Sequence, residues 1–173
     1  MATFEELIRQ DLMALVHRFF PTIVLDATGE PNTARVLTAG REFDRSTPRL
    51  YKAQVPASNP PQADLYRVTA DVSVTAALEL HSARQLDAGA LIEELLRGSL
   101  PAQGPAWTWR GRSVRVIRTL VRTRLADIKT CFKETFEVSY QAPFFSVRRA
   151  PQIADETWFD GWEPAVVAEI AHA

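Results

Sequence analysis

Few side chains in this sequence combine a reactive type with a spacing that suits catalysis or metal binding. The three histidines, His17, His81 and His172, form no metal-ligand motif with a cysteine or carboxylate. No phosphate-binding loop and no Gly-X-Ser-X-Gly turn is present. The one cysteine, Cys131, lies in a strand-like run and is expected to be a small buried hydrophobic residue rather than a nucleophile. We therefore predict no enzyme activity, no metal site and no cofactor.

Glu134 is the most unusual carboxylate, because it interrupts an apolar alternation. The apolar residues that share its face are Phe132, Phe136, Val138 and Tyr140. A buried carboxylate is costly unless it is paired. The preceding strand-like run offers three partners: Arg115, Arg118 and Arg122. We predict a structural or inter-subunit ion pair for Glu134, with a solvent-exposed edge position and a catalytic acid as the alternatives.

The main charge asymmetry is a basic run. Residues 110–129 contain seven basic side chains and one acid, Asp127. Three interpretations are open: a solvated sheet face, an interface with an acidic protein surface, or nucleic-acid binding. The chain has a net charge of −1 and lacks the aromatic spacing of a single-strand binding platform, which disfavours the third. The interface residues we predict in this region are Arg112, Arg115, Arg118, Arg122 and Glu134.

An aromatic cluster near the C-terminus is the other candidate contact surface. Trp158, Phe159 and Trp162 stand among four acidic residues. They would either cap the core of their own domain or dock on a neighbouring subunit, where tryptophan is favoured. Because the tail is acidic and the run at 110–129 is basic, the two are complementary across a subunit boundary.

Two elements that would position these residues are clear in the sequence. A helix is predicted over residues 4–19, with Thr3 and Glu6 as a capping box. Residues 68–80 alternate apolar and mostly polar side chains for thirteen residues, which predicts a long half-buried strand.

The following elements are a second helix and two strands. We expect the helix to begin with a capping box at Ser82 and Gln85, to bury Leu86, Ala90, Leu91, Ile92, Leu95 and Leu96, and to end at Gly98. Residues 112–125 and 129–145 are predicted strands. The first of these alternates less cleanly, which predicts a β-bulge near residues 116–117.

Residues 21–65 hold six of the eleven prolines, which predicts an irregular arm containing short strands. The fold class is α+β: a mainly antiparallel twisted sheet with helices packed on one face. We expect a single domain over residues 1–145, with the arm inserted at about 21–65. A C-terminal tail with a short helix would follow over residues 146–173.

The order of these elements resembles the tail terminator family of tailed bacteriophages. The resemblance is carried by the opening helix, by "YRVTADVSVTAALELHSARQLDAGALIEELLRGSL" as a strand–helix unit, and by "RSVRVIRTLV" with "KETFEVSYQA" as the closing strand pair. It covers about 70% of the chain and is one of pattern and order, since the family has no short diagnostic motif. The proline-rich arm and the aromatic tail depart from it.

The resemblance implies a structural virion protein. Copies would form a cyclic homo-oligomer, commonly a hexamer, that caps the tail tube, stops its polymerisation and joins the tail to the head connector. The partners would be the tail tube and connector proteins, with no membrane and no sequence-specific nucleic acid, and assembly would occur in the host cytoplasm. Another neck, tail-completion or adaptor protein is the first alternative, and a small enzyme with a dispersed site is the second.

Overall fold

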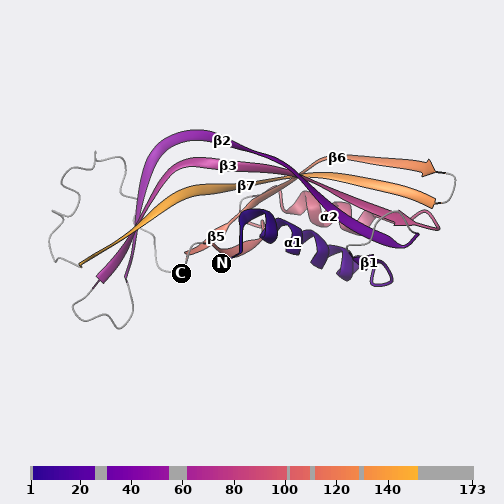
Figure 1. Cartoon of the computed structure of the whole chain (residues 1–173), viewed down its shortest axis with the longest axis horizontal. Helices are drawn as coiled ribbons and strands as arrows, with labels where there is room; N and C mark the ends of the chain where they lie inside the picture. The colour runs from indigo at the N-terminus through magenta and orange to yellow at the C-terminus, as the bar shows by residue number, and fades with distance from the viewer. Residues whose placement is uncertain are drawn as a thin grey trace. The chain divides into compact units, whose positions relative to one another are not determined.

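The computed structural model describes residues 2–25, 31–54, 62–100, 102–109, 112–128 and 131–151 (Figure 1). The chain divides into two compact units, one of residues 1–42 and 73–142 and the other of residues 43–72 and 143–173. The α+β class is confirmed. The elements are α1 (Phe4–Phe19), β1 (Val24–Leu25), β2 (Thr33–Gln54), β3 (Gln62–Ser82), α2 (Gly89–Arg97), β4 (Ala106–Trp109), β5 (Arg112–Arg115), β6 (Ile117–Ile128) and β7 (Cys131–Pro151).

Helix α1 begins as the sequence predicts. The backbone N–H of Thr3 donates to Glu6 Oε2 at 2.6 Å, and the N–H of Glu6 donates to Thr3 Oγ1 at 3.2 Å. Two N–H groups that lack helical partners are therefore satisfied reciprocally. One face of the helix is buried through Phe4, Ile8, Leu12, Met13, Leu15 and Val16.

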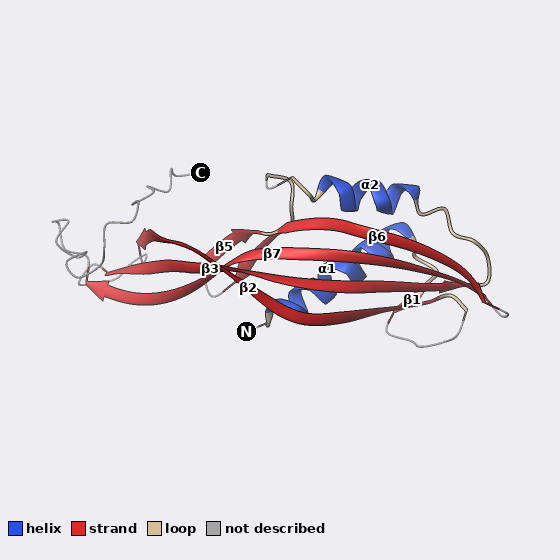
Figure 2. Cartoon of the chain, turned by 90° about the horizontal axis from the view of Figure 1, so that it is seen from above, coloured by secondary structure: helices blue, strands red, loops and turns tan. Residues whose placement is uncertain are grey.

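The main sheet has the strand order β1-β2-β3-β7-β6, and β4 and β5 form a separate hairpin (Figure 2). The predicted alternation in β3 is confirmed, because every even residue from Val68 to Leu80 is at most 8% exposed. In the first unit, α1 and α2 lie on the same face of the sheet (Figure 1). The even residues of β3 from Val74 to Leu80 are thus the floor of the core in that unit.

The β4–β5 hairpin packs its aromatic side chains against the start of α1. Phe4 stacks on Trp109 with ring centroids 5.2 Å apart and meets the edge of Trp107 at 5.9 Å. Trp107 in turn stacks on Tyr140 of β7 at 6.0 Å. These four rings join the hairpin to the helix and to the sheet.

The second unit takes residues 43–54 of β2, 62–72 of β3 and 143–151 of β7 among the described residues. Two edge-to-face aromatic pairs lie within it: Phe43 with Phe144, and Tyr66 with the buried Phe145. Arg149 forms an ion pair with Asp64. Residues 152–173, which include the predicted short helix, lie outside the described residues.

The prediction of an irregular arm over residues 21–65 is wrong for most of that segment. Residues 33–54 form one strand of 22 residues, β2. Its pairing with β1 involves only Thr33 and Ala34, so among the described residues its outer edge is open beyond that point. Pro48 is compatible with such a strand because a proline lacks only the N–H that an inner strand would need.

The start of the second helix also differs from the prediction. Strand β3 continues to Ser82, whose hydroxyl accepts a hydrogen bond from the N–H of Arg84 and donates to Asn32. Helix α2 begins only at Gly89, with no side-chain cap. Its narrower buried stripe consists of Leu91 and Leu95, whereas Ala90 and Leu96 are exposed. Pairing of the strand through Ser82 therefore prevails over the local capping signal.

The predicted bulge exists but lies further along the chain. The N–H of Val116 donates to the carbonyl of Pro105, and this contact separates β5 from β6. The register shift falls between Leu120 and Arg122 of β6. Before it the even residues face the helices, and after it the odd residues do, because one extra residue reverses the alternation.

We predict that Gly104→Ala destabilises the first unit. A Cβ at this position would lie 1.9 Å from the carbonyl oxygen of Val116, so the backbone would have to move. The expected loss in unfolding free energy is about 1–3 kcal/mol by chemical denaturation. Gly40→Ala is the control, because its Cβ would have no atom within 4 Å. Equal stability of the two variants would contradict the close approach at Gly104.

Candidate assembly surface

The second half of β6 is an open sheet edge. Strand β6 pairs only with β7 among the described residues, and it is an outer strand of the sheet (Figure 2). All eight residues from Val121 to Ile128, which we call the edge segment, are exposed. They include apolar side chains that are 58% exposed at Val121, 50% at Leu125 and 40% at Ile128. Unpaired backbone groups beside apolar side chains form a template for pairing with another strand.

The two arginines of the edge segment lie on its outer face, the face turned away from the helices. Arg122 lies opposite Glu137 of β7 and donates to both of its carboxylate oxygens. Arg124 is exposed and has no ion-pair partner among the described residues. Thr123 and Leu125 stand on the helix side, opposite Phe136 and Glu134. Ala126 and Ile128 share the outer face with the two arginines, and Asp127 stands on the helix side, so each face of the edge segment carries both charged and apolar side chains.

The first half of β6 is anchored by Arg118. Its side chain is only 3% exposed, and Nη1 donates to Asp11 of α1 at 2.9 Å. Nη2 donates to the carbonyl oxygen of Glu94 in α2 at 3.1 Å. Tyr140 of β7 donates to the same Asp11 oxygen at 2.8 Å. This network joins two helices and two strands around one buried charge.

The electrostatics keep the Tyr140 hydroxyl of this network protonated. Burial, and after it the negative charge of Asp11, raises the pKa of the Tyr140 phenol well above its ordinary value. Tyr140 therefore remains a donor to the carboxylate. The prediction that Arg118 lies at an interface does not fit its burial: both Nη atoms donate within its own chain, while its buried Nε has no hydrogen-bond partner among the described residues.

We predict that Arg118→Ala lowers the free energy of unfolding by about 3–5 kcal/mol, because it leaves Asp11 without a compensating charge. Arg124→Ala is the matched control on the exposed part of the same strand, with an expected change of about 0.5 kcal/mol or less. Chemical denaturation measures both variants. Should Arg118→Ala prove too unstable to purify, Arg118→Lys retains the charge and is expected to fall between them. Equal stability of Arg118→Ala and Arg124→Ala would contradict a structural role for Arg118.

Glu134 has no ion pair or hydrogen bond with its predicted partners. Arg118 and Arg122 bind other carboxylates, and Arg115 donates to the carbonyl of Gly104 at 2.8 Å. Glu134 is half-buried and lies opposite Leu125. Burial raises the pKa of its carboxyl above the ordinary value. Within the chain, none of the three predicted arginines forms an ion pair with Glu134, and the inter-subunit ion pair stays a prediction.

The raised pKa of Glu134 predicts a pH-dependent stability. Because the folded state holds this proton more tightly, stability falls as pH rises from the unfolded pKa through the folded one. We expect Glu134→Gln to be more stable than the wild type at neutral pH. The difference should vanish below the ordinary pKa of about 4.3. Thermal unfolding at both pH values tests this, with Glu93→Gln on the exposed side of α2 as control. A less stable Glu134→Gln variant at neutral pH would contradict it.

The other predicted interface residues do not gather at the edge segment. Arg112 is half-buried in β5, and Arg115 is exposed at the end of that strand. Trp158, Phe159 and Trp162 lie outside the described residues. Only Arg122 belongs to both the predicted set and the edge segment. The apolar part of the edge was missed by sequence reasoning, because strand order decides which strand is outermost.

A buried polar cluster on the other face of the sheet was also missed. Glu79 accepts from Arg35 of β2 at 2.5 Å and from Lys133 of β7 at 2.7 Å. Burial opposes its ionisation, but hydrogen bonds from Lys133 and Arg35 outweigh burial and hold the pKa of Glu79 below its ordinary value. The sequence held one sign of this cluster: Glu79 and His81 are two residues apart in β3, so both lie on the polar face of the strand.

Cys131, His81 and Glu79 follow the order of a thiol triad, but their geometry does not support catalysis. His81 Nδ1 lies 3.9 Å from the Cys131 sulfur, and His81 Nε2 lies 3.9 Å from Glu79 Oε2. The second distance is too long for a hydrogen bond. The predicted burial of Cys131 is confirmed at 5% exposure, which leaves a substrate little access to the thiol. We interpret the group as a structural ion cluster.

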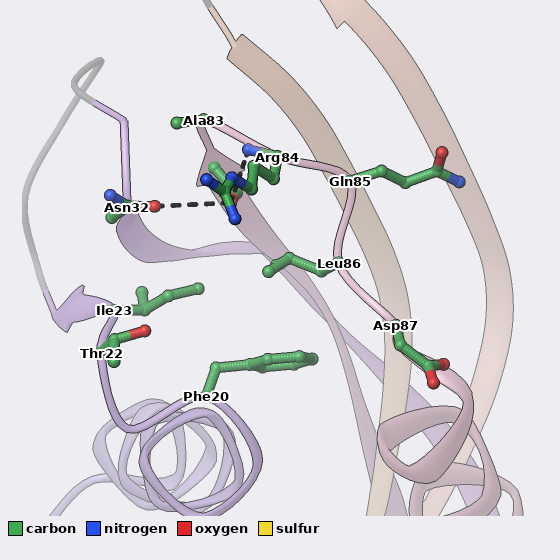
Figure 3. A pocket seen from close by; sticks show the side chains of 10 residues that line it. Phe20, Thr22, Ile23, Asn32, Ala83, Arg84, Gln85, Leu86 and Asp87 are labelled. Atoms are coloured by element: carbon green, nitrogen blue, oxygen red, sulfur yellow. Dashed lines mark hydrogen bonds between the residues drawn. The ribbon is translucent and has the colours of Figure 1, made fainter.

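A pocket of about 490 Å³ opens between three connections of the first unit (Figure 3). Phe20, Ile23 and Leu86 supply apolar walls, and Asn32 hydrogen-bonds Ser82 at the rim. Among the described residues, the lining contains no histidine or cysteine. Asp87 is the one carboxylate of the described lining, and it accepts from the N–H of Gly89 at the start of α2. The described lining residues therefore offer no paired nucleophile and base.

Further tests of the described residues and of the sequence add no other site. Within the described ranges, no three His, Cys, Asp or Glu residues are placed to hold a metal ion. No helix in the described part of the chain is long and apolar enough to span a membrane. Neither a protein-family model nor a curated protein sequence matches the chain.

Proposed function

We propose that this protein is a structural component of a tailed-bacteriophage virion that acts as a tail terminator. Copies would assemble into a closed ring that caps the tail tube, stops its polymerisation and joins it to the head connector. The ring would form without a cofactor and would have no enzyme activity. The proposal rests on the sequence resemblance for its biological setting and on the edge segment for its mechanism.

The observation that carries the proposal is the exposure of the edge segment. Natural proteins protect long apolar sheet edges, because such edges pair with other chains. Here eight consecutive exposed residues end in Ile128, and three of them are large and apolar. Such an edge is suited to association by strand addition, in which backbone hydrogen bonds supply affinity and side chains supply specificity.

Because Arg118 is buried, the part of the basic run that we assign to assembly is limited to the exposed residues that follow it. The basic run begins in a hairpin and passes through the core at Arg118 before it reaches the surface at Val121. Subunit contacts are therefore assigned to the edge segment, and contacts with the tube and connector to other surfaces of the ring. A different neck or adaptor protein would share the association surface, so tail-tube capping is the test that separates the two.

We predict that Leu125→Lys abolishes ring formation and leaves the fold intact. Lysine at an exposed edge blocks strand pairing, and Leu125 is 50% exposed. Leu96→Lys on α2 is the matched control, because Leu96 is 52% exposed and lies on a helix. Mass photometry and negative-stain electron microscopy measure assembly, and circular dichroism measures the fold.

The outcomes separate the parts of the proposal. Rings of the wild type and of Leu96→Lys, but not of Leu125→Lys, support the edge segment as the association surface. Rings of all three proteins contradict that assignment. A wild-type protein that stays monomeric and leaves purified tail tubes able to elongate would contradict the terminator function itself.

A further inference from the structure

We infer that neighbouring subunits join edge to edge, with residues 122–126 of the edge segment of one copy pairing antiparallel with residues 35–39 of β2 of the next, beyond the point where β1 ends its contact with β2. The inference is based on two open strand edges, β6 on one side of the sheet and β2 on the other. The two edges lie at the same height along the strand direction. This inference deepens the proposed function, on which it rests for the existence of a ring. It names the partner surface that the edge segment binds.

Strand β2 supplies the second open edge of the first unit. The parallel contact with β1 ends at Ala34. From Leu37 to Glu42 every residue of β2 is exposed, and Leu37 itself is 47% exposed. Among the described residues, nothing pairs with this side of β2 beyond Ala34. The sheet of the first unit therefore has two unpaired edges that carry exposed apolar side chains.

The two open edges lie at the same level along the strands. Glu79 of β3 binds both Arg35 of β2 and Lys133 of β7, so these three residues form a row across the sheet. Lys133 lies opposite Ala126 of β6 in the strand register. The row therefore runs from Arg35 at one edge to Ala126 at the other. A rotation about a ring axis along the strands would bring these positions of adjacent copies together without a shift.

The strand directions make the contact antiparallel. Asn32 lies beside Ser82 and Arg35 beside Glu79, so β2 and β3 run in opposite directions. Glu79 contacts Lys133 and His81 contacts Cys131, so β3 and β7 do the same. Strand β6 is antiparallel to β7. Because each of these three neighbouring pairs is antiparallel, β2 and β6 run in opposite directions. When two copies have the same orientation, the β6 edge of one therefore pairs with the β2 edge of the next as an ordinary antiparallel ladder.

The row also sets which side chains meet. If Ala126 lies opposite Arg35, then Leu125 lies opposite Val36 on the helix side and Arg124 lies opposite Leu37 on the outer face. The apolar pair Leu125–Val36 extends the covered side of the sheet across the boundary. Arg35 and Arg122 on the outer face are already neutralised within their own chains by Glu79 and Glu137.

Charge disfavours two registers of a two-fold pairing between one edge segment and another copy of itself, and the register centred on Leu125 is left to the cross-linking test below. Centred on residue 123 such a pairing would place Arg122 opposite Arg124, and centred on residue 124 it would place Arg124 opposite its own equivalent. Like charges directly opposite each other destabilise a strand pair. Pairing of two different edges avoids this repulsion. Because each copy then has one edge of each kind, the contact can repeat from copy to copy, and it gives the ring of the proposed function when the rotation between copies closes.

Cysteine cross-linking tests the pairing in the full-length chain. The variant with Val36→Cys and Leu125→Cys is oxidised, blocked with N-ethylmaleimide and run on a non-reducing gel. We expect a ladder of covalent species up to the size of the ring, since Cβ atoms of opposite residues lie about 4.5–5.5 Å apart in such pairs. A second pair on the outer face, Leu37→Cys with Arg124→Cys, is expected to give the same ladder.

The controls make the result specific. The mixed pair Leu37→Cys with Leu125→Cys places the thiols on opposite faces and should give at least tenfold less cross-linking. Each single variant should stay monomeric on the gel, which also controls for the native Cys131. Covalent dimers from Leu125→Cys alone would overturn the inference in favour of a two-fold contact. Rings in the microscope without a ladder from either pair would overturn it and leave the proposed function standing. A ladder without closed rings would support edge pairing and contradict the ring.

Discussion

The guanidinium of Arg118 is the charge around which the first unit is built. It takes part in contacts with Asp11 of α1 and Glu94 of α2, while Tyr140 of β7 completes the coordination of Asp11. A charge in the interior is tolerated only when its hydrogen bonds are nearly complete, so each of these elements must lie within a narrow range of positions. The close approach of Gly98, where a Cβ would come within 2.7 Å of Arg118 Nε, follows from the same requirement. The direction in which β6 leaves the core is thereby fixed.

Local chemistry in the sequence was enough to predict α1 and β3. The helix start at Thr3 depends on two hydrogen bonds within four residues, and the alternation from Val68 to Leu80 needs only one covered face. Both signals are complete within a single segment. The α+β class could be predicted for the same reason, since it follows from the types of the elements rather than from their spatial order.

The features that define the candidate site depend on relations between distant segments. Arginine is rarely buried, so Arg118 was expected at the surface, although Val114, Val116 and Leu120 share its phase and mark it as inward-facing. The prolines in and around β2 indicated an irregular arm. A strand at an open edge tolerates proline, but the sequence does not show that β2 lies at such an edge. The exposure of Leu125 likewise follows from strand order, and strand order is a property of the whole fold.

The bulge between Leu120 and Arg122 divides β6 into two stretches with different constraints on their evolution. Substitutions before it change side chains that pack against α2 and β7, so they are limited by whether the chain folds. Those after it change residues that contribute little to the core, so their tolerance depends on what binds there. A lineage could therefore alter its partner along residues 121–128 while its own fold stayed the same. Sequence divergence among relatives would then change abruptly at Val121, within a single strand.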